Sequence, residues 1–139
     1  MKTLQNEKVN IKIILAALWI DVMFIYVYAD IKTLFQPEIL EQIISGIVGG
    51  MTINQSFLFA AAVLMSVPPI MIILSLILKP SINRWVNIIV SFLHIILIII
   101  TRFVPAKIWY YYIYYQSIEA IIHSLIIWYA WRWPIQDEQ

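Results

Sequence analysis

Residues 86–103 read VNIIVSFLHIILIIITRF, an almost uninterrupted apolar run with one histidine near its middle. A helix needs about 20 mainly apolar residues to cross a hydrocarbon core of about 30 Å. Three further segments meet this criterion, residues 11–35, 53–78 and 107–131. The sequence therefore predicts an all-α fold, an up-down antiparallel bundle of four transmembrane helices.

The composition extends this interpretation to the whole chain. Of the 139 residues, 63% are apolar and 12% are charged, and the mean hydropathy is +0.86. So few charged side chains cannot cover a water-exposed surface of this size. We therefore expect a single integral membrane domain over residues 1–139, with the lipid bilayer as its main partner.

Net charge and cysteine content exclude several classes of function. The net charge is only +1 and no basic run occurs, which argues against nucleic-acid binding. The chain contains no cysteine, which excludes disulfides, thiolate metal sites and iron–sulfur clusters. Serines occur, but nothing in their spacing marks a nucleophile, so no catalytic residue is assigned.

Positively charged residues are distributed unevenly over the connections. One side collects six of them (Lys2, Lys8, Lys12, Lys79, Arg84 and Arg132), and the other collects three (Lys32, Arg102 and Lys107). Cytoplasmic connections of membrane proteins carry the excess of Lys and Arg. We therefore expect both termini in the cytoplasm, in a multi-pass protein of a bacterial inner (plasma) membrane.

The connections themselves suggest how the spans pack. In the longest connection, residues 38–45 fit a short amphipathic helix on the membrane surface. Tight turns at residues 81–83 and 104–106 predict that the last three spans pack consecutively. Small residues at 46–50 and 60–62 offer a surface for close packing, which favours a homo-oligomer.

Four ionisable side chains interrupt the predicted spans at nearly the same depth: Asp21, His94, Glu119 and His123. At about 1.5 Å per residue, three of them lie roughly 12–13 Å from the same boundary, and Glu119 lies one turn further. Glu119 and His123 are four residues apart, which places them on one helix face. A charged group in hydrocarbon costs about 2.5–3.5 kcal/mol, so such residues usually serve a function.

Neighbouring polar residues extend this layer. Asn87 and Ser91 lie on the same face of the predicted helix as His94, and we expect them to form a polar access route from the cytoplasm. Tyr28 lies on the Asp21 side of the first segment. Each of these faces should turn into the bundle, because a polar side chain is costly against lipid.

Two further features stand apart from the layer. Asp30 falls on the opposite face from Asp21, and we expect it to pair with Arg102 or Lys107. Pro68-Pro69, in the middle of the second span, removes two backbone donors and predicts a kink.

Several functions fit the polar layer. The first is binding or translocation of a small solute or of protons, with the four ionisable residues as a pocket or proton relay. The alternative is a metal- or haem-dependent membrane enzyme, because Asp21, His94, Glu119 and His123 also suit zinc, manganese or iron. An accessory subunit of a larger membrane complex, or purely structural hydrogen bonding between helices, fits as well. The sequence identifies neither the solute nor a cofactor.

A set of residues in the first three spans resembles one known family. They are Trp19, Asp21, Tyr28-Ala29-Asp30, Pro37, Gly49-Gly50, Asn83-Arg84-Trp85 and Asn87. Together they resemble a bacterial family of small four-span membrane proteins of unknown function. Where that family carries an acidic residue before the proline of the second span, this chain has Ser66. The resemblance implies the four-span topology and adds no mechanism.

Overall fold

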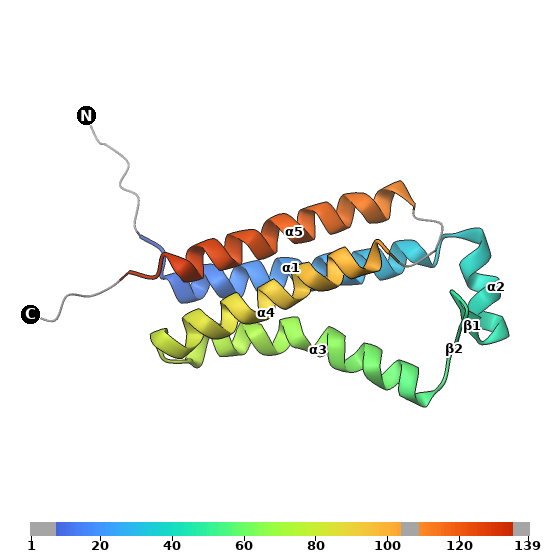
Figure 1. The fold of residues 1–139 in the computed structure, drawn as a ribbon, viewed down its shortest axis with the longest axis horizontal. Coiled ribbons are helices and arrows are strands. Elements are labelled where there is room, and N and C mark those ends of the chain that lie inside the picture. The colour runs from blue at the N-terminus through green and yellow to red at the C-terminus, as the bar shows by residue number, and fades with distance from the viewer. Residues whose placement is uncertain (1–7, 104–108, 135–139) are drawn as a thin grey trace, which may run out of the picture.

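A computed structural model describes residues 8–103 and 109–134 of the chain as five helices and one small hairpin (Figure 1). In chain order the elements are α1 (Ile11–Thr33), α2 (Pro37–Ser45), β1 (Ile47–Val48), β2 (Met51–Thr52), α3 (Gln55–Ile77), α4 (Pro80–Thr101) and α5 (Tyr110–Trp131). The all-α class is confirmed, and the two-residue strands are the one exception in the described part of the chain.

Three of the long helices, α1, α3 and α4, are long and apolar enough to cross a membrane. The remaining long helix, α5, is as long as α4, with 22 residues. Its tyrosine, glutamine, glutamate and histidine side chains make it less apolar. Three candidate spans are therefore present among the described residues, and the membrane crossing of α5 stays a prediction.

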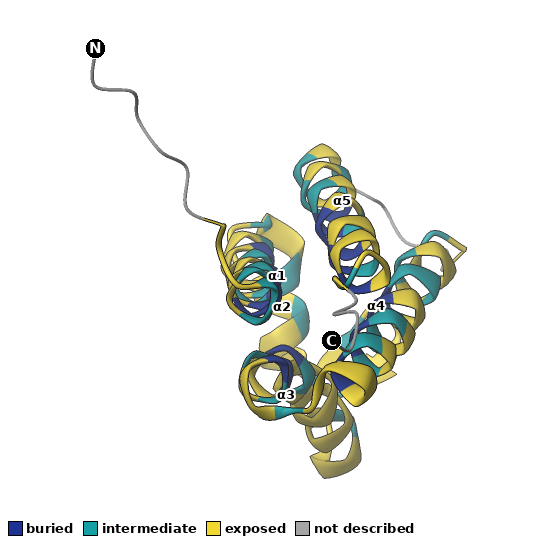
Figure 2. Cartoon of the chain, turned by 90° about the vertical axis from the view of Figure 1, so that its left-hand side faces the viewer, coloured by how far each residue is buried: buried dark blue, intermediate teal, exposed yellow. Residues whose placement is uncertain are grey.

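The four long helices lie side by side and alternate in direction (Figure 1). Helix α1 packs against α3 and α5, and α5 packs against α4, whereas α3 meets α4 at few residues. Buried residues on α1, α4 and α5 face the centre of the bundle (Figure 2). The apolar core there consists of Leu15, Trp19, Val22, Met71, Ile122, Ile126 and Ala130. The predicted consecutive packing thus holds for α4 and α5 and is weak between α3 and α4.

The bundle has two distinct ends. The terminal end is where α1 begins and α5 ends, and Lys12 of α1 donates there to the carbonyl of Leu78 after α3, at 2.7 Å. The hairpin end holds α2 and the two strands (Figure 1). At this end the hydroxyl of Tyr111 on α5 is hydrogen-bonded to Thr33, at 3.0 Å, and to Gln36. Side-chain hydrogen bonds therefore fasten α1 to a different neighbour at each end.

Helix α4 begins earlier than the sequence predicts. Residues 81–83, expected to form a tight turn, lie in the first turn of the helix. Pro80 occupies the start, where its missing N–H would have no intrahelical partner in any case. The longer helix brings Asn83 onto the buried face. The other predicted turn, at residues 104–106, lies outside the described residues, as do Lys2 and Lys107.

Helix α3 bends at Pro68-Pro69, and its burial differs on the two sides of these prolines. The half before the prolines leans away from the other long helices in Figure 1. Residues 58–66 are all exposed, whereas Ser75, after the prolines, is buried. Proline rings replace the N–H groups that would bond to the carbonyls of Leu64 and Met65, which explains the bend. The predicted kink is therefore present.

The connection between α1 and α3 contains the predicted short helix, as α2. It ends at Gly46, whose φ of 76° lies in the left-handed region that favours glycine. Gly49 and Gly50 form the hairpin turn with φ values of 56° and 80°, as a type I′ turn requires. The location of α2 on a membrane surface stays a prediction.

Candidate functional site

Buried polar residues follow one face of α4 from the terminal end to the middle of the bundle. Asn83, Asn87, Ser91 and His94 recur at spacings of three or four residues, and all four are buried. Helix α5 presents a matching buried set, Gln116, Glu119 and His123. The two sets form two groups with different hydrogen bonding.

The first group, which we call the asparagine network, consists of Trp19, Ser75, Asn83 and Asn87. The amide oxygen of Asn87 accepts from the indole N–H of Trp19, at 2.7 Å, and from the hydroxyl of Ser75, at 3.3 Å. Its amide nitrogen donates to the side-chain oxygen of Asn83 at 2.7 Å, and Asn83 donates to the Ser75 carbonyl at 2.6 Å. Every polar side-chain atom of the four residues is paired, and the network joins α1, α3 and α4.

The second group, which we call the histidine centre, consists of His94, Glu119 and His123, with Tyr26 of α1 beside them. The Tyr26 hydroxyl donates to Oε1 of Glu119 at 2.8 Å and lies 2.6 Å from Nδ1 of His94. The rings of His94 and His123 have their centroids 4.8 Å apart. One ligand atom from each of the three lies within 4.8 Å of the other two.

The hydrogen bonds of Tyr26 determine which nitrogen of His94 carries hydrogen. A phenol has one hydrogen, and Tyr26 gives it to Glu119. His94 Nδ1 must then donate to the phenol oxygen across their 2.6 Å contact. In the neutral imidazole this leaves Nε2 as the nitrogen with a free lone pair.

His123 is fully buried, with 0% of its surface exposed. Neither of its ring nitrogens has a hydrogen-bond partner among residues 8–103 and 109–134. Its Nε2 lies 3.7 Å from Oε1 of Glu119, which is too long for a hydrogen bond. The edge of Trp19 packs against both imidazoles, with centroid distances of 5.5 Å to His123 and 5.8 Å to His94. The buried imidazole therefore has hydrogen-bonding capacity that no described residue uses.

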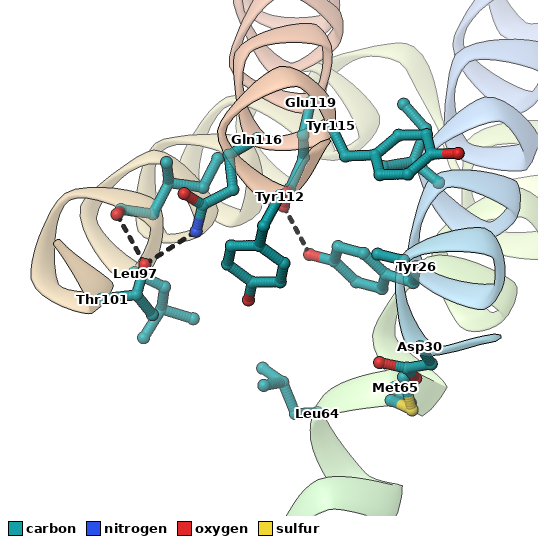
Figure 3. Close-up of a pocket in the computed structure, with 13 residues that line it drawn as sticks. Tyr26, Asp30, Leu64, Met65, Leu97, Thr101, Tyr112, Tyr115, Gln116 and Glu119 are labelled. Atoms are coloured by element: carbon teal, nitrogen blue, oxygen red, sulfur yellow. Dashed lines mark hydrogen bonds between the residues drawn. The ribbon is translucent and has the colours of Figure 1, made fainter. Parts of the chain in front are cut away.

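A cavity of about 190 Å³ lies beside the histidine centre, between α1, α3, α4 and α5 (Figure 3). We call it the tyrosine pocket. It is lined by Ile25, Tyr26, Ala29, Asp30, Leu64, Met65, Leu97, Ile98, Thr101, Tyr112, Tyr115, Gln116 and Glu119. Gln116 donates to the Thr101 hydroxyl at 2.9 Å, and its buried oxygen has no partner among the described residues. Glu119 belongs to both the pocket and the histidine centre, and Tyr26, which is hydrogen-bonded to this centre, also lines the pocket.

The structure brings together three of the four ionisable residues of the predicted layer, His94, Glu119 and His123. Asn87 and Ser91 are buried on the same face of α4 as His94, although Asn87 belongs to the asparagine network. The hydroxyl of Ser91 has no partner among the residues described. Ser91 therefore lies between the two groups without joining either.

Asp21 and Tyr28 do not lie where the sequence predicts. Both are exposed on the outside of α1, with Tyr28 at 54% exposure, and neither reaches the histidine centre. The buried face of this helix instead contains Trp19 and Val22. Trp19 and Asp21 are two residues apart, or about 200° around the helix, so they cannot both face inward. Burying the large indole decides the orientation.

Asp30 lines the tyrosine pocket. No salt bridge joins it to Arg102 in the described part of the chain, and Lys107 lies outside that part. Tyr26 was missed by the sequence interpretation. Its signal was the spacing: it follows Trp19 by seven residues, which places both on one face.

Comparison with known proteins gives a family and no activity. The chain matches, over residues 1–139, the family described as a family of unknown function (DUF6326), and it belongs to that family. No curated protein and no solved structure matches the chain.

Proposed function

We propose that this member of a family of unknown function is a four-span plasma-membrane protein that binds a small solute in the tyrosine pocket. The observation that carries the proposal is Glu119, a buried carboxylate that lines a cavity of about 190 Å³ between four helices. Pockets between the helices of a bundle, with a few converging polar groups, are common ligand sites. A cavity of this size suits a small solute.

The lining indicates the chemistry of the solute. Glu119 and the unpaired oxygen of Gln116 are hydrogen-bond acceptors, so the solute needs an N–H or O–H donor. Leu64 and Leu97 on the opposite helices offer apolar contact. Small amines and alcohols with an apolar body combine both properties, and the tyrosine rings favour a cationic amine.

The kink in α3 supports access to the pocket from the side of the bundle. Leu64 and Met65 line the pocket and belong to the half of α3 that leans away from the other helices. That half has no buried residue between positions 58 and 66. A solute dissolved in the membrane would reach Glu119 between α3 and α4.

Two features support the finer topology. The helices α1, α3, α4 and α5 alternate in direction, so a membrane crossed by three of them would also contain α5 (Figure 1). Lys12, Lys79 and Arg132 all belong to the terminal end, where the excess of positive charge predicts the cytoplasm. Buried Ser91, whose hydroxyl has no partner among the described residues, continues from the histidine centre toward that end, which favours translocation of the bound solute.

Cysteine labelling tests the pocket directly, because the natural chain contains no cysteine. Leu64→Cys places a thiol in the pocket, and Leu93→Cys places one on an exposed face of α4 away from it. We expect 2-aminoethyl methanethiosulfonate, a small amine, to label Leu64→Cys several-fold faster in proteoliposomes.

The carboxylate is tested in the same assay. Glu119→Gln should slow the labelling of Leu64→Cys, because the attraction for the ammonium group is lost. Asp21→Asn, the same change on the outside of α1, should leave the rate unchanged. Equal labelling at positions 64 and 93, or equal effects of the two charge removals, would contradict the proposal.

A further inference from the structure

The histidine centre contains the ligand types of a transition-metal site. Two imidazoles and one carboxylate hold zinc in several enzymes, with metal–ligand bonds of about 2.0–2.2 Å. Ligand atoms on one tetrahedral zinc then lie about 3.3 Å from each other. His123 Nε2 and Glu119 Oε1 are already 3.7 Å apart, and all three residues offer ligand atoms within 4.8 Å. Binding of a metal ion would require the ligand atoms to approach one another by up to about 1.5 Å.

The unpaired imidazole of His123 is an independent observation that points to a ligand. A buried polar group without a partner costs about 1–3 kcal/mol. His123 is fully buried, and neither nitrogen is hydrogen-bonded within the described residues. A role as hydrogen-bonding glue between helices would have used at least one of these nitrogens. A metal ion would use one as a ligand.

Tyr26 orients the other two residues as metal ligands require. Metal-binding histidines usually donate their second ring N–H to a neighbouring acceptor, which fixes the tautomer. His94 Nδ1 has such an acceptor in the Tyr26 oxygen, so its Nε2 lone pair is free to bind. The same hydroxyl donates to Glu119 and restrains its carboxylate. Tyr26 is therefore a positioning residue for two ligands at once.

From this geometry we propose that His94, Glu119 and His123 bind one divalent transition-metal ion, with Zn²⁺ preferred. Two imidazoles argue against Mg²⁺ and Ca²⁺, which prefer oxygen ligands throughout. Three protein ligands leave one position of a tetrahedral ion open. Glu119 also lines the tyrosine pocket, which provides the route by which the ion and a fourth ligand arrive.

The proposed site excludes Asp21, which faces away from the bundle. This difference provides a matched control, since Asp21→Asn and Glu119→Gln remove one carboxylate each from the same protein. The site shares Glu119 with the solute proposal, but separate measurements test the two. Metal titration tests the three proposed ligands, whereas cysteine labelling tests access to Leu64. One proposal can therefore fail while the other holds.

The test is a titration of the purified, tag-free protein in detergent with Co²⁺, whose visible absorption reports coordination, followed by competition with Zn²⁺. We expect about one Co²⁺ per chain, displaced by Zn²⁺, and elemental mass spectrometry to give the same stoichiometry. Glu119→Gln and His123→Gln should each weaken binding by at least about 100-fold. Asp21→Asn should bind as the wild type does.

Tyr26→Phe separates positioning from ligation. Loss of such an outer contact typically weakens metal affinity by about 10–100-fold, while the ligand set remains. We therefore expect weaker binding with a retained cobalt spectrum. Circular dichroism and gel filtration would check that each variant is folded. Absence of binding by the folded wild type, or equal binding by Glu119→Gln and Asp21→Asn, would overturn the proposal.

Discussion

Asn87 and His94 lie on the same face of α4, seven residues apart, yet their surroundings differ in hydrogen bonding. In the asparagine network every polar side-chain atom is paired. In the histidine centre, His123 is equally buried but has no hydrogen bond to any described residue. Buried polar groups are normally satisfied, so the exceptions require an explanation.

The comparison separates structural hydrogen bonding from a candidate binding site. Helix-to-helix hydrogen bonds in membranes contribute about 0.6 kcal/mol each on average, and a paired network needs no other role. The histidine centre gains little stability from His123, and it borders a cavity through Glu119. Substitution of Asn87 should therefore lower the free energy of unfolding strongly, and substitution of His123 should change it little, provided that metal is removed with a chelator.

The largest loss of stability is expected for Asn87→Leu, a substitution of similar shape. It removes four hydrogen bonds and leaves the buried indole N–H of Trp19 without an acceptor. At about 0.6 kcal/mol per bond, the free energy of unfolding should fall by about 2 kcal/mol. Reversible unfolding in mixed detergent, followed by circular dichroism, measures this change. A loss below about 0.5 kcal/mol would contradict a structural role for the network.

A smaller loss is expected for Tyr26→Phe, which tests the one well-bonded part of the histidine centre. The change removes two hydrogen bonds, to His94 and to Glu119, and keeps the ring. The free energy of unfolding should fall by about 1 kcal/mol in the same assay. Tyr28→Phe, on the exposed side of α1, is the matched control and should change nothing. Equal effects at the two positions would contradict the assigned orientation of α1.

Most of the helix positions could be predicted from the sequence. Apolar runs of membrane-spanning length locate both ends of α1 and α3 and the end of α4 within two residues, and the prolines predict the kink in α3. The start of α4 was wrong because Pro80 both follows one helix and begins the next. Sequence spacing also placed Glu119 and His123 on one face, because helical periodicity within a single element is fixed.

The orientation of α1 could not be predicted from its polar residues. Asp21 argued for one face, while Trp19 and Tyr26 occupy the opposite one. The choice depends on which face fits the neighbouring helices, and this is a property of the assembled bundle. The tyrosine pocket could not be predicted either, since it depends on how far the first half of α3 leans away.

Ser75→Ala should lower the free energy of unfolding less than Tyr26→Phe does, because Ser75 contributes one long hydrogen bond, 3.3 Å to Asn87. Its carbonyl, which accepts from Asn83, is untouched by the substitution. The expected loss is about 0.5 kcal/mol in detergent unfolding. Ser124→Ala, at an exposed position on α5, serves as the reference: it removes only a hydrogen bond to the carbonyl of Ala120 within the same helix and should be close to neutral. A loss at Ser75 as large as that at Asn87 would show that the network is not organised around Asn87.

The smallest effect is expected for His123→Leu in the presence of chelator. The imidazole has no hydrogen bond to lose among the described residues, and leucine is apolar and of similar size. Removing an unsatisfied buried polar group should leave stability within about 0.5 kcal/mol of the wild type, or raise it. The same variant should lose metal binding. A loss of about 2 kcal/mol, as expected for Asn87→Leu, would show that His123 is structural and would erase the difference between the two groups.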